Sequence, residues 1–145
     1  MASATPTKHR IFVAEDDRLV LDLIRTRLLL ADYDVSFGRD GWEAIRGIRD
    51  NPPTAILLDI NMPKLDGFGV LEELKRHPNT ASIPVMALTA RNAPDDVQRA
   101  IKLGARDYLS KPFKDAQLIA RVSRLVRMTA PRGSLPSGSQ EPFEI

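Results

Sequence analysis

The sequence predicts an α/β protein built on a doubly wound, five-stranded parallel sheet. Two observations lead to this fold class. Strand-type and helix-type hydrophobic periods alternate five times along the chain, and the strand segments are short, mostly apolar runs. Strands that alternate with helices pair in parallel through right-handed crossovers, and continuous apolar runs are typical of strands buried on both faces. For five such strands we expect the spatial order 2-1-3-4-5.

The first strand and the first helix open the periodic part of the chain. Ile11 to Ala14 is an uninterrupted apolar run, as expected of a central strand. In the segment that follows, apolar residues recur at helical spacing and predict a buried face made of Val20, Leu23, Ile24, Leu28 and Ala31. Leu21, Leu29 and Leu30 fall outside this face, so we expect them to add apolar surface to the helix.

The second and third units repeat the pattern. Tyr33 to Phe37 is a short strand-type run, and the next helical stripe consists of Ala44, Ile45 and Ile48. Ala55 to Leu58 is again wholly apolar, and this strand ends at Asp59. Asp66 can cap the following helix, because aspartate accepts hydrogen bonds from the first free backbone amides of a helix. The buried residues of that helix are expected to be Val70, Leu71 and Leu74.

The fourth and fifth units complete the sheet. The fourth strand, residues 85–88, ends at Thr89, and a helix over residues 95–103 is terminated by Gly104. A short strand follows at 107–110. The last helix spans about 115–128, with an inward face of Leu118, Ile119, Val122, Leu125 and Val126. Arg121, Arg124 and Arg127 recur along it at intervals of three, and we interpret them as a solvated face that complements the helix dipole.

The composition fits one intracellular domain. We expect a disordered arm at residues 1–8, a folded domain at 9–129, and at 130–145 a Pro-, Gly- and Ser-rich segment that is a disordered tail or a truncated linker. The absence of cysteine excludes a disulfide framework and a thiolate nucleophile. A formal net charge of +2 gives no reason to expect nucleic-acid binding. No apolar run is long enough for a membrane span, so we expect a cytoplasmic protein.

Polar residues stand at the ends of four strands. Glu15, Asp16 and Asp17 follow the first strand and Asp59 ends the third, and Thr89 and Lys111 occupy the corresponding positions of the fourth and fifth. The carboxyl ends of parallel strands meet at one edge of the sheet, which is where such sheets bind ligands. We therefore expect these side chains to converge, with Asp17 serving as a helix cap.

The convergence raises a problem of charge. Carboxylates brought close together repel one another, and a hard divalent cation such as Mg²⁺ relieves the repulsion when all donors are oxygens. A lysine and a hydroxyl beside one carboxylate suit a phosphoryl group, whose oxygens must be neutralised in the transition state. Asp59 is the candidate acceptor, because it stands alone at the end of the central strand and can act as a nucleophile.

Four motifs in this order resemble the receiver domain of bacterial two-component response regulators, of the stand-alone CheY-like type. The resemblance covers about residues 10–128. The motifs are Glu15-Asp16-Asp17, then Asp59 through Pro63 with Asp66-Gly67, then Pro84 with Thr89-Ala90, and finally Gly104 through Phe113. It implies a flavodoxin-like fold in which a phosphoaspartate controls signalling.

The resemblance also implies a role for each site residue. Asp59 would accept a phosphoryl group from a histidine kinase or a phosphotransfer protein. Mg²⁺ would be the cofactor, bound by Asp16 and Asp59, by Glu15 through water, and by the backbone carbonyl of Asn61.

Three further roles follow from the same resemblance. Thr89 would donate a hydrogen bond to the phosphoryl group, and Lys111 would form an ion pair with it. Tyr108 matches the aromatic residue whose rotamer is linked to movement of Thr89. The Lys111–Pro112 peptide bond is expected to be cis.

The function expected on this basis is that of a phosphoprotein switch, not an enzyme. Its partners would be a kinase or phosphotransfer protein and an unidentified downstream protein, with no direct contact to nucleic acid or membrane. The chain would be a monomer or a phosphorylation-dependent homodimer.

Two alternatives come from other classes of protein. One is a phosphohydrolase of the haloacid-dehalogenase type, although that family places its nucleophile on the first strand, whereas Asp59 lies on the third and position 61 is Asn. The other is an interaction module that does not need phosphate, although here every site position is filled.

Overall fold

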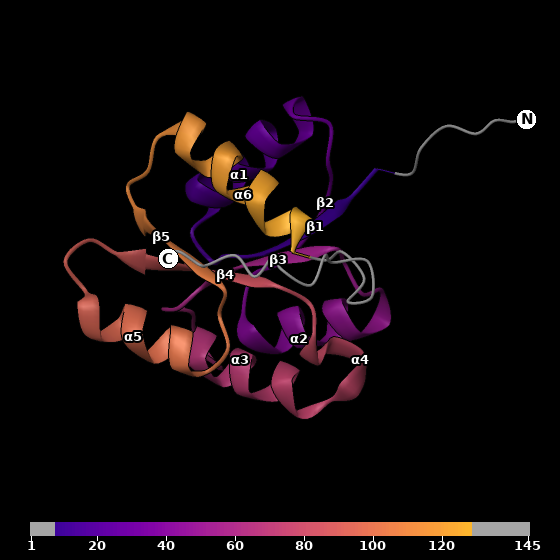
Figure 1. Ribbon diagram of the computed structural model, residues 1–145, viewed down its shortest axis with the longest axis vertical. Helices are drawn as coiled ribbons and strands as arrows, with labels where there is room; N and C mark the ends of the chain where they lie inside the picture. Colours follow the sequence, from indigo (N-terminus) through magenta and orange to yellow (C-terminus); the bar gives the residue numbers. More distant parts are fainter. Residues whose placement is uncertain (1–7, 129–145) are drawn as a thin grey trace, which may run out of the picture.

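The computed structural model describes residues 8–128 and contains the expected five-stranded parallel sheet (Figure 1). The strand order is β2-β1-β3-β4-β5, which confirms the prediction. The strands are β1 (Arg10–Ala14), β2 (Asp34–Gly38), β3 (Ala55–Asp59), β4 (Val85–Ala90) and β5 (Asp107–Lys111). β3 lies at the centre and is buried along its whole length, as its apolar sequence predicts.

Helices cover both faces of the sheet (Figure 1). One face carries α1 (Arg18–Leu30) and α6 (Asp115–Arg127), and the other carries α2 (Gly41–Asp50), α3 (Gly67–Arg76) and α5 (Pro94–Lys102). The single-turn helix α4 (Pro78–Ala81) was not predicted, because four residues are too few to show a helical period. Within residues 8–128, no helix is long and apolar enough to cross a bilayer.

The sheet separates two apolar cores. On the side of α2, α3 and α5, the core includes Phe12, Ile48 and Leu71, and on the side of α1 and α6 it includes Ile24, Leu57 and Leu118. Alternate residues of β1, β3 and β4 point to opposite sides, so each strand contributes to both cores. The ends of these three strands are therefore fixed by packing on both faces of the sheet.

Helix α1 is rotated relative to the prediction. Leu21, which was expected on the outside, is buried together with Ile24 and Leu28, while Leu23, which was expected inside, is 39% exposed. Residues 21, 24 and 28 follow the spacing of three and four that one helix face requires, and this face meets the sheet. The outer face exposes Leu19 and Leu30, as well as Leu23.

Side-chain caps fix where the helices begin. The carboxylate of Asp17 accepts hydrogen bonds from the backbone amides of Leu19 and Val20 at 2.9 and 3.3 Å. Asp66 accepts from the amide of Gly69 at 2.9 Å, which confirms its predicted role. Both caps directly follow loops at the carboxyl edge of the sheet, so they hold those loops as well as the helices.

Gly67 connects the central strand to α3. Its amide donates to the carbonyl of Ile60 at 2.9 Å, and a Cβ atom at this position would lie 2.5 Å from the carbonyl oxygen of Asp59. A Cβ on Gly69, two residues later, would lie 2.5 Å from a methyl carbon of the Leu65 side chain. Gly67 therefore faces a rigid backbone and Gly69 a flexible side chain.

We expect Gly67→Ala to lower the free energy of unfolding by about 2 kcal/mol, because overpacking against backbone cannot relax by a change of rotamer. Gly69→Ala should stay within about 1 kcal/mol of the parent protein, since Leu65 can move and alanine favours the helix. Urea unfolding of the two variants measures both values. Equal losses would show that the contact between Gly67 and Asp59 has no special importance.

Candidate acidic site at the carboxyl edge of the sheet

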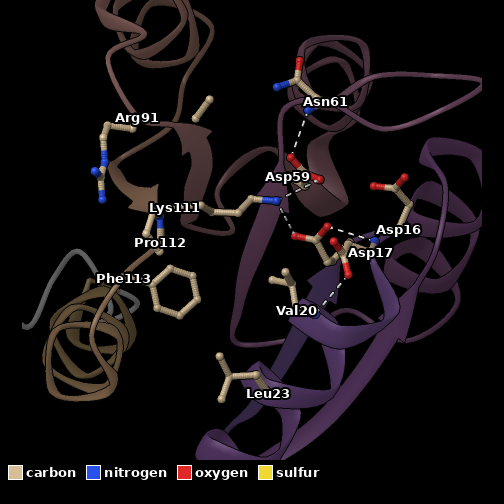
Figure 2. Close-up of a pocket in the computed structure, with 12 residues that line it drawn as sticks. Asp16, Asp17, Val20, Leu23, Asp59, Asn61, Arg91, Lys111, Pro112 and Phe113 are labelled. Atoms are coloured by element: carbon tan, nitrogen blue, oxygen red, sulfur yellow. Dashed lines mark hydrogen bonds and ion pairs between the residues drawn. The ribbon is translucent and has the colours of Figure 1, made fainter.

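The ends of β1, β3 and β5 and the loop after β4 enclose a pocket of about 550 Å³ (Figure 2). Its polar lining includes Glu15, Asp16, Asp59, Asn61 and Lys111. The pocket lies where the strand order reverses between β1 and β3, which is the expected place for a ligand in a doubly wound sheet. The structure thus brings together the carboxylates and the lysine that the sequence placed at separate strand ends.

Three carboxylates meet in this pocket. Glu15, Asp16 and Asp59 each offer an oxygen, and these oxygens lie within 4.8 Å of one another. The side chain of Glu15 is fully buried and Asp59 is 3% exposed. Burial, followed by the nearby charge of Glu15, raises the pKa of Asp59 to about 7.

Lys111 is the cation that contacts both buried carboxylates. Its Nζ lies 2.9 Å from Oε1 of Glu15 and 3.4 Å from Oδ2 of Asp59 (Figure 2). Burial alone would lower the pKa of Lys111, but the hydrogen bond to Glu15 and the charge of Asp59 outweigh this effect and raise it. The lysine therefore stays charged, yet one positive charge faces two buried carboxylates.

Backbone amides hold the remaining oxygens. The amide of Asn61 donates to Oδ1 of Asp59 at 3.0 Å, and the amide of Asp17 donates to Oε2 of Glu15 at 3.1 Å. Glu15 thus has one backbone donor and one side-chain donor, and Asp59 has one backbone donor and an ion pair with Lys111. Asn61 lines the pocket beside Asp59, while the metal-binding role of its carbonyl stays a prediction.

The donor set suits a hard divalent cation. All three clustered ligands are carboxylate oxygens, with no sulfur or imidazole among them, and such a set favours Mg²⁺ over zinc. The excess negative charge beside Lys111 is a reason for a cation to bind there. The residues present fit the metal that the sequence predicts.

Thr89 and Tyr108 occupy neighbouring strands on the same side of the sheet. Tyr108 pairs with Ala87, and Ser110 pairs with Thr89. Thr89 is fully buried, its hydroxyl lies 3.5 Å from that of Ser110, and it is not among the residues that line the pocket. Tyr108 is 38% exposed. The predicted roles of both residues therefore stay predictions, and Lys111–Pro112 is cis as expected.

The last helix contains a cluster that the sequence interpretation missed. Arg121 and Arg124 both form ion pairs with Asp107, which is only 7% exposed, so they are not simply a solvated face. The spacing of three between the arginines was a signal that they share one helix face. Their acidic partner could not be recognised, because Asp107 lies within a strand.

The fold and the site together define a class of protein. Its members are parallel α/β domains with a buried acidic pocket at the carboxyl edge of the sheet. The profile of the response regulator receiver domain matches residues 11–123. The chain belongs to this family.

Two curated relatives illustrate the match. The transcriptional regulatory protein PrrA of Mycobacterium tuberculosis is 42% identical over 139 residues, which cover 96% of this chain and 58% of that protein. Response regulator MprA of Mycobacterium bovis is 38% identical over 128 residues, covering 88% of this chain and 55% of that protein. The chain therefore spans little more than half the length of these relatives.

Solved structures agree with the family assignment. The receiver domain of Francisella response regulator 1452 is 33% identical, with a TM-score of 0.77 over 84% of this chain and 99% of that one. The receiver domain of sensor histidine kinase PA1611 from Pseudomonas aeruginosa is 31% identical, with a TM-score of 0.78 over 83% and 99%. That second structure holds a magnesium ion coordinated in its active-site cleft.

The raised pKa of Asp59 predicts a pH-dependent gain from Asp59→Asn. The folded protein favours the neutral form of the Asp59 carboxyl. The loss of folding stability caused by its raised pKa is therefore absent near pH 4, grows up to about pH 7, and is complete above that pH. Without metal, we expect the variant to be more stable than the parent protein by roughly 2–4 kcal/mol at pH 8, a gap that closes toward pH 4. Urea unfolding in EDTA at several pH values measures it.

Asp17→Asn is the matched control, because asparagine also caps helices and position 17 lies outside the carboxylate cluster. Its stability relative to the parent protein should not vary with pH in this way. A gain for Asp59→Asn that is the same at every pH would contradict the assigned electrostatic cause.

Proposed function

We propose that this chain is a cytoplasmic signalling domain in which Asp59 accepts a phosphoryl group from a histidine kinase or a phosphotransfer protein. The observation that carries the proposal is the setting of the Asp59 carboxylate. It ends the central strand, lines the pocket, and has its oxygens held by the amide of Asn61 and by Lys111. A fixed, buried carboxylate beside a cation is well placed for nucleophilic attack on an anionic donor.

The reaction is an in-line displacement. A carboxylate oxygen of Asp59 forms a bond to phosphorus, the bond from phosphorus to the donor nitrogen breaks, and the electron pair leaves with the donor. Lys111 would turn from the free carboxylate to the phosphoryl oxygens, and Thr89 would donate a hydrogen bond to one of them.

Mg²⁺ would be held by Glu15, Asp16, Asp59 and the backbone carbonyl of Asn61. When bound, it supplies positive charge that neutralises the carboxylates and the phosphoryl oxygens. The three clustered carboxylate oxygens support this part of the proposal.

The pocket rim supports a protein as the donor. Val20 and Leu23 of α1 and Phe113, which follows β5, line the pocket (Figure 2). Leu19, which precedes Val20 on α1, is exposed. Apolar side chains beside an acidic centre suit a protein surface better than a small ionic substrate. We therefore propose that the kinase or phosphotransfer protein contacts α1 as it delivers the phosphoryl group.

The output is proposed to pass through protein contacts on the face formed by α5, β5 and α6. Phosphorylation would draw Thr89 toward Asp59, and Tyr108 would turn inward. Because relatives are named as transcriptional regulatory proteins, we propose that this change controls transcription through a DNA-binding partner or partner domain. The receiver residues themselves would not touch DNA, would catalyse only their own phosphorylation and dephosphorylation, and would act as a monomer or a phosphorylation-dependent homodimer.

Incubation with acetyl phosphate and Mg²⁺ should add one phosphoryl group to the intact protein, as measured by mass spectrometry. Asp59→Asn should add none, because the nucleophilic oxygen is lost, while Asp17→Asn should be modified like the parent protein. Phosphorylation of another residue in Asp59→Asn would overturn the assignment. Multiple turnover of varied phosphate esters would instead indicate a phosphohydrolase.

Mg²⁺ should raise thermal stability in proportion to the logarithm of its concentration once binding begins to saturate. Asp16→Asn should remove most of this gain, because Asp16 belongs to the carboxylate cluster, whereas Asp17→Asn should keep it. Thermal unfolding at increasing MgCl₂ measures both variants. A larger loss in Asp17→Asn would mean that the acidic residues after β1 are assigned wrongly.

A further inference from the structure

Two arginines of α6 hold one buried aspartate of β5. Nη1 of Arg121 lies 3.1 Å from Oδ1 of Asp107, and Nη2 of Arg124 lies 2.8 Å from Oδ2. Each arginine therefore takes a different oxygen of the same carboxylate. Removal of either one leaves Asp107 paired with the other, so the buried charge keeps a partner.

Arg121 also contacts Tyr108, the next residue of β5. Its guanidinium donates to the carbonyl oxygen of Tyr108 and lies 5.6 Å from the centre of the ring, which is within the range of a cation–π interaction. Within residues 8–128, neither a hydrogen bond nor a ring contact joins Arg124 to Tyr108. The two arginines thus share Asp107 but differ in their contact with the aromatic ring.

The contact with Arg121 holds the Tyr108 ring at the exposed edge of the sheet. β5 is one of the two edge strands of the sheet, and Tyr108 is 38% exposed there. Thr89 lies on the adjacent strand, on the same side of the sheet as Tyr108, and is fully buried. A ring that turned from the edge toward Thr89 would leave the guanidinium, which Asp107 holds in place.

We propose that Arg121 is a positioning residue that holds Tyr108 outward and thereby opposes the phosphorylated form of the domain. The signalling consequence rests on the proposed function, whereas the effect on the ring does not. From the usual strength of exposed cation–π contacts, loss of Arg121 should raise the inward population of Tyr108 about two- to fivefold. The rate of Asp59 phosphorylation should rise by up to the same factor if the inward form reacts faster.

The test compares Arg121→Gln with Arg124→Gln, each alone and combined with Tyr108→Ala. NMR of the unphosphorylated protein, with the tyrosine rings isotopically labelled, reports the orientation of Tyr108, and Tyr33 serves as an internal reference. Intact mass after mixing with acetyl phosphate and Mg²⁺ gives the phosphorylation rate. Urea unfolding shows that the variants remain folded.

Arg121→Gln should shift the NMR signals of Tyr108 and speed phosphorylation, whereas Arg124→Gln should do neither. In the Tyr108→Ala background, Arg121→Gln should no longer change the rate of phosphorylation. Equal effects of the two arginine variants, or a rate effect that persists without the ring, would overturn the proposal. If the parent protein takes up no phosphate, the proposed function fails. The NMR comparison then still decides whether Arg121 holds the ring.

Discussion

Glu15 and Asp59 are both buried at the carboxyl edge of the sheet, and Lys111 is the cation that reaches them. Two buried carboxylates therefore share one lysine, and this excess of negative charge determines how the site is arranged. The carboxylates cannot move apart, because each is tied to a backbone amide and each belongs to a strand or strand end that is packed from both sides. The repulsion instead appears as the raised pKa of Asp59, and it is relieved when positive charge enters the pocket.

The rest of the fold maintains this arrangement. The backbone at Asp59 is packed against Gly67 at the start of α3, where no side chain can be added without a clash. The loop after β1 is held by Asp17, whose amide binds Glu15 while its carboxylate caps α1. A domain that keeps repelling charges close together gives up some stability, which is common where a site must bind a charged ligand.

The sequence predicted those features that depend on local pattern and on the rules of parallel sheets. Glu15, Asp59 and Lys111 were expected to meet because strand ends converge at one edge, and they do. The burial of Leu21 was missed because several leucines of α1 fit a helical stripe and only packing decides between them. The pairing of Asp107 with Arg121 and Arg124 was missed for a related reason, since it joins a strand to a distant helix at a register that no local pattern specifies.

The two cores lie on opposite sides of the sheet, and their side chains do not mix. The sheet therefore acts as a partition, and a rearrangement of side chains in the layer of α2, α3 and α5 need not disturb the layer of α1 and α6. Arg121 lies at the edge of the sheet, where the separation between the two layers ends. It belongs to α6 but reaches around the edge strand β5 to contact Tyr108. Communication between the two layers can thus pass around the rim of the sheet, without any change in the tightly packed strands at its centre.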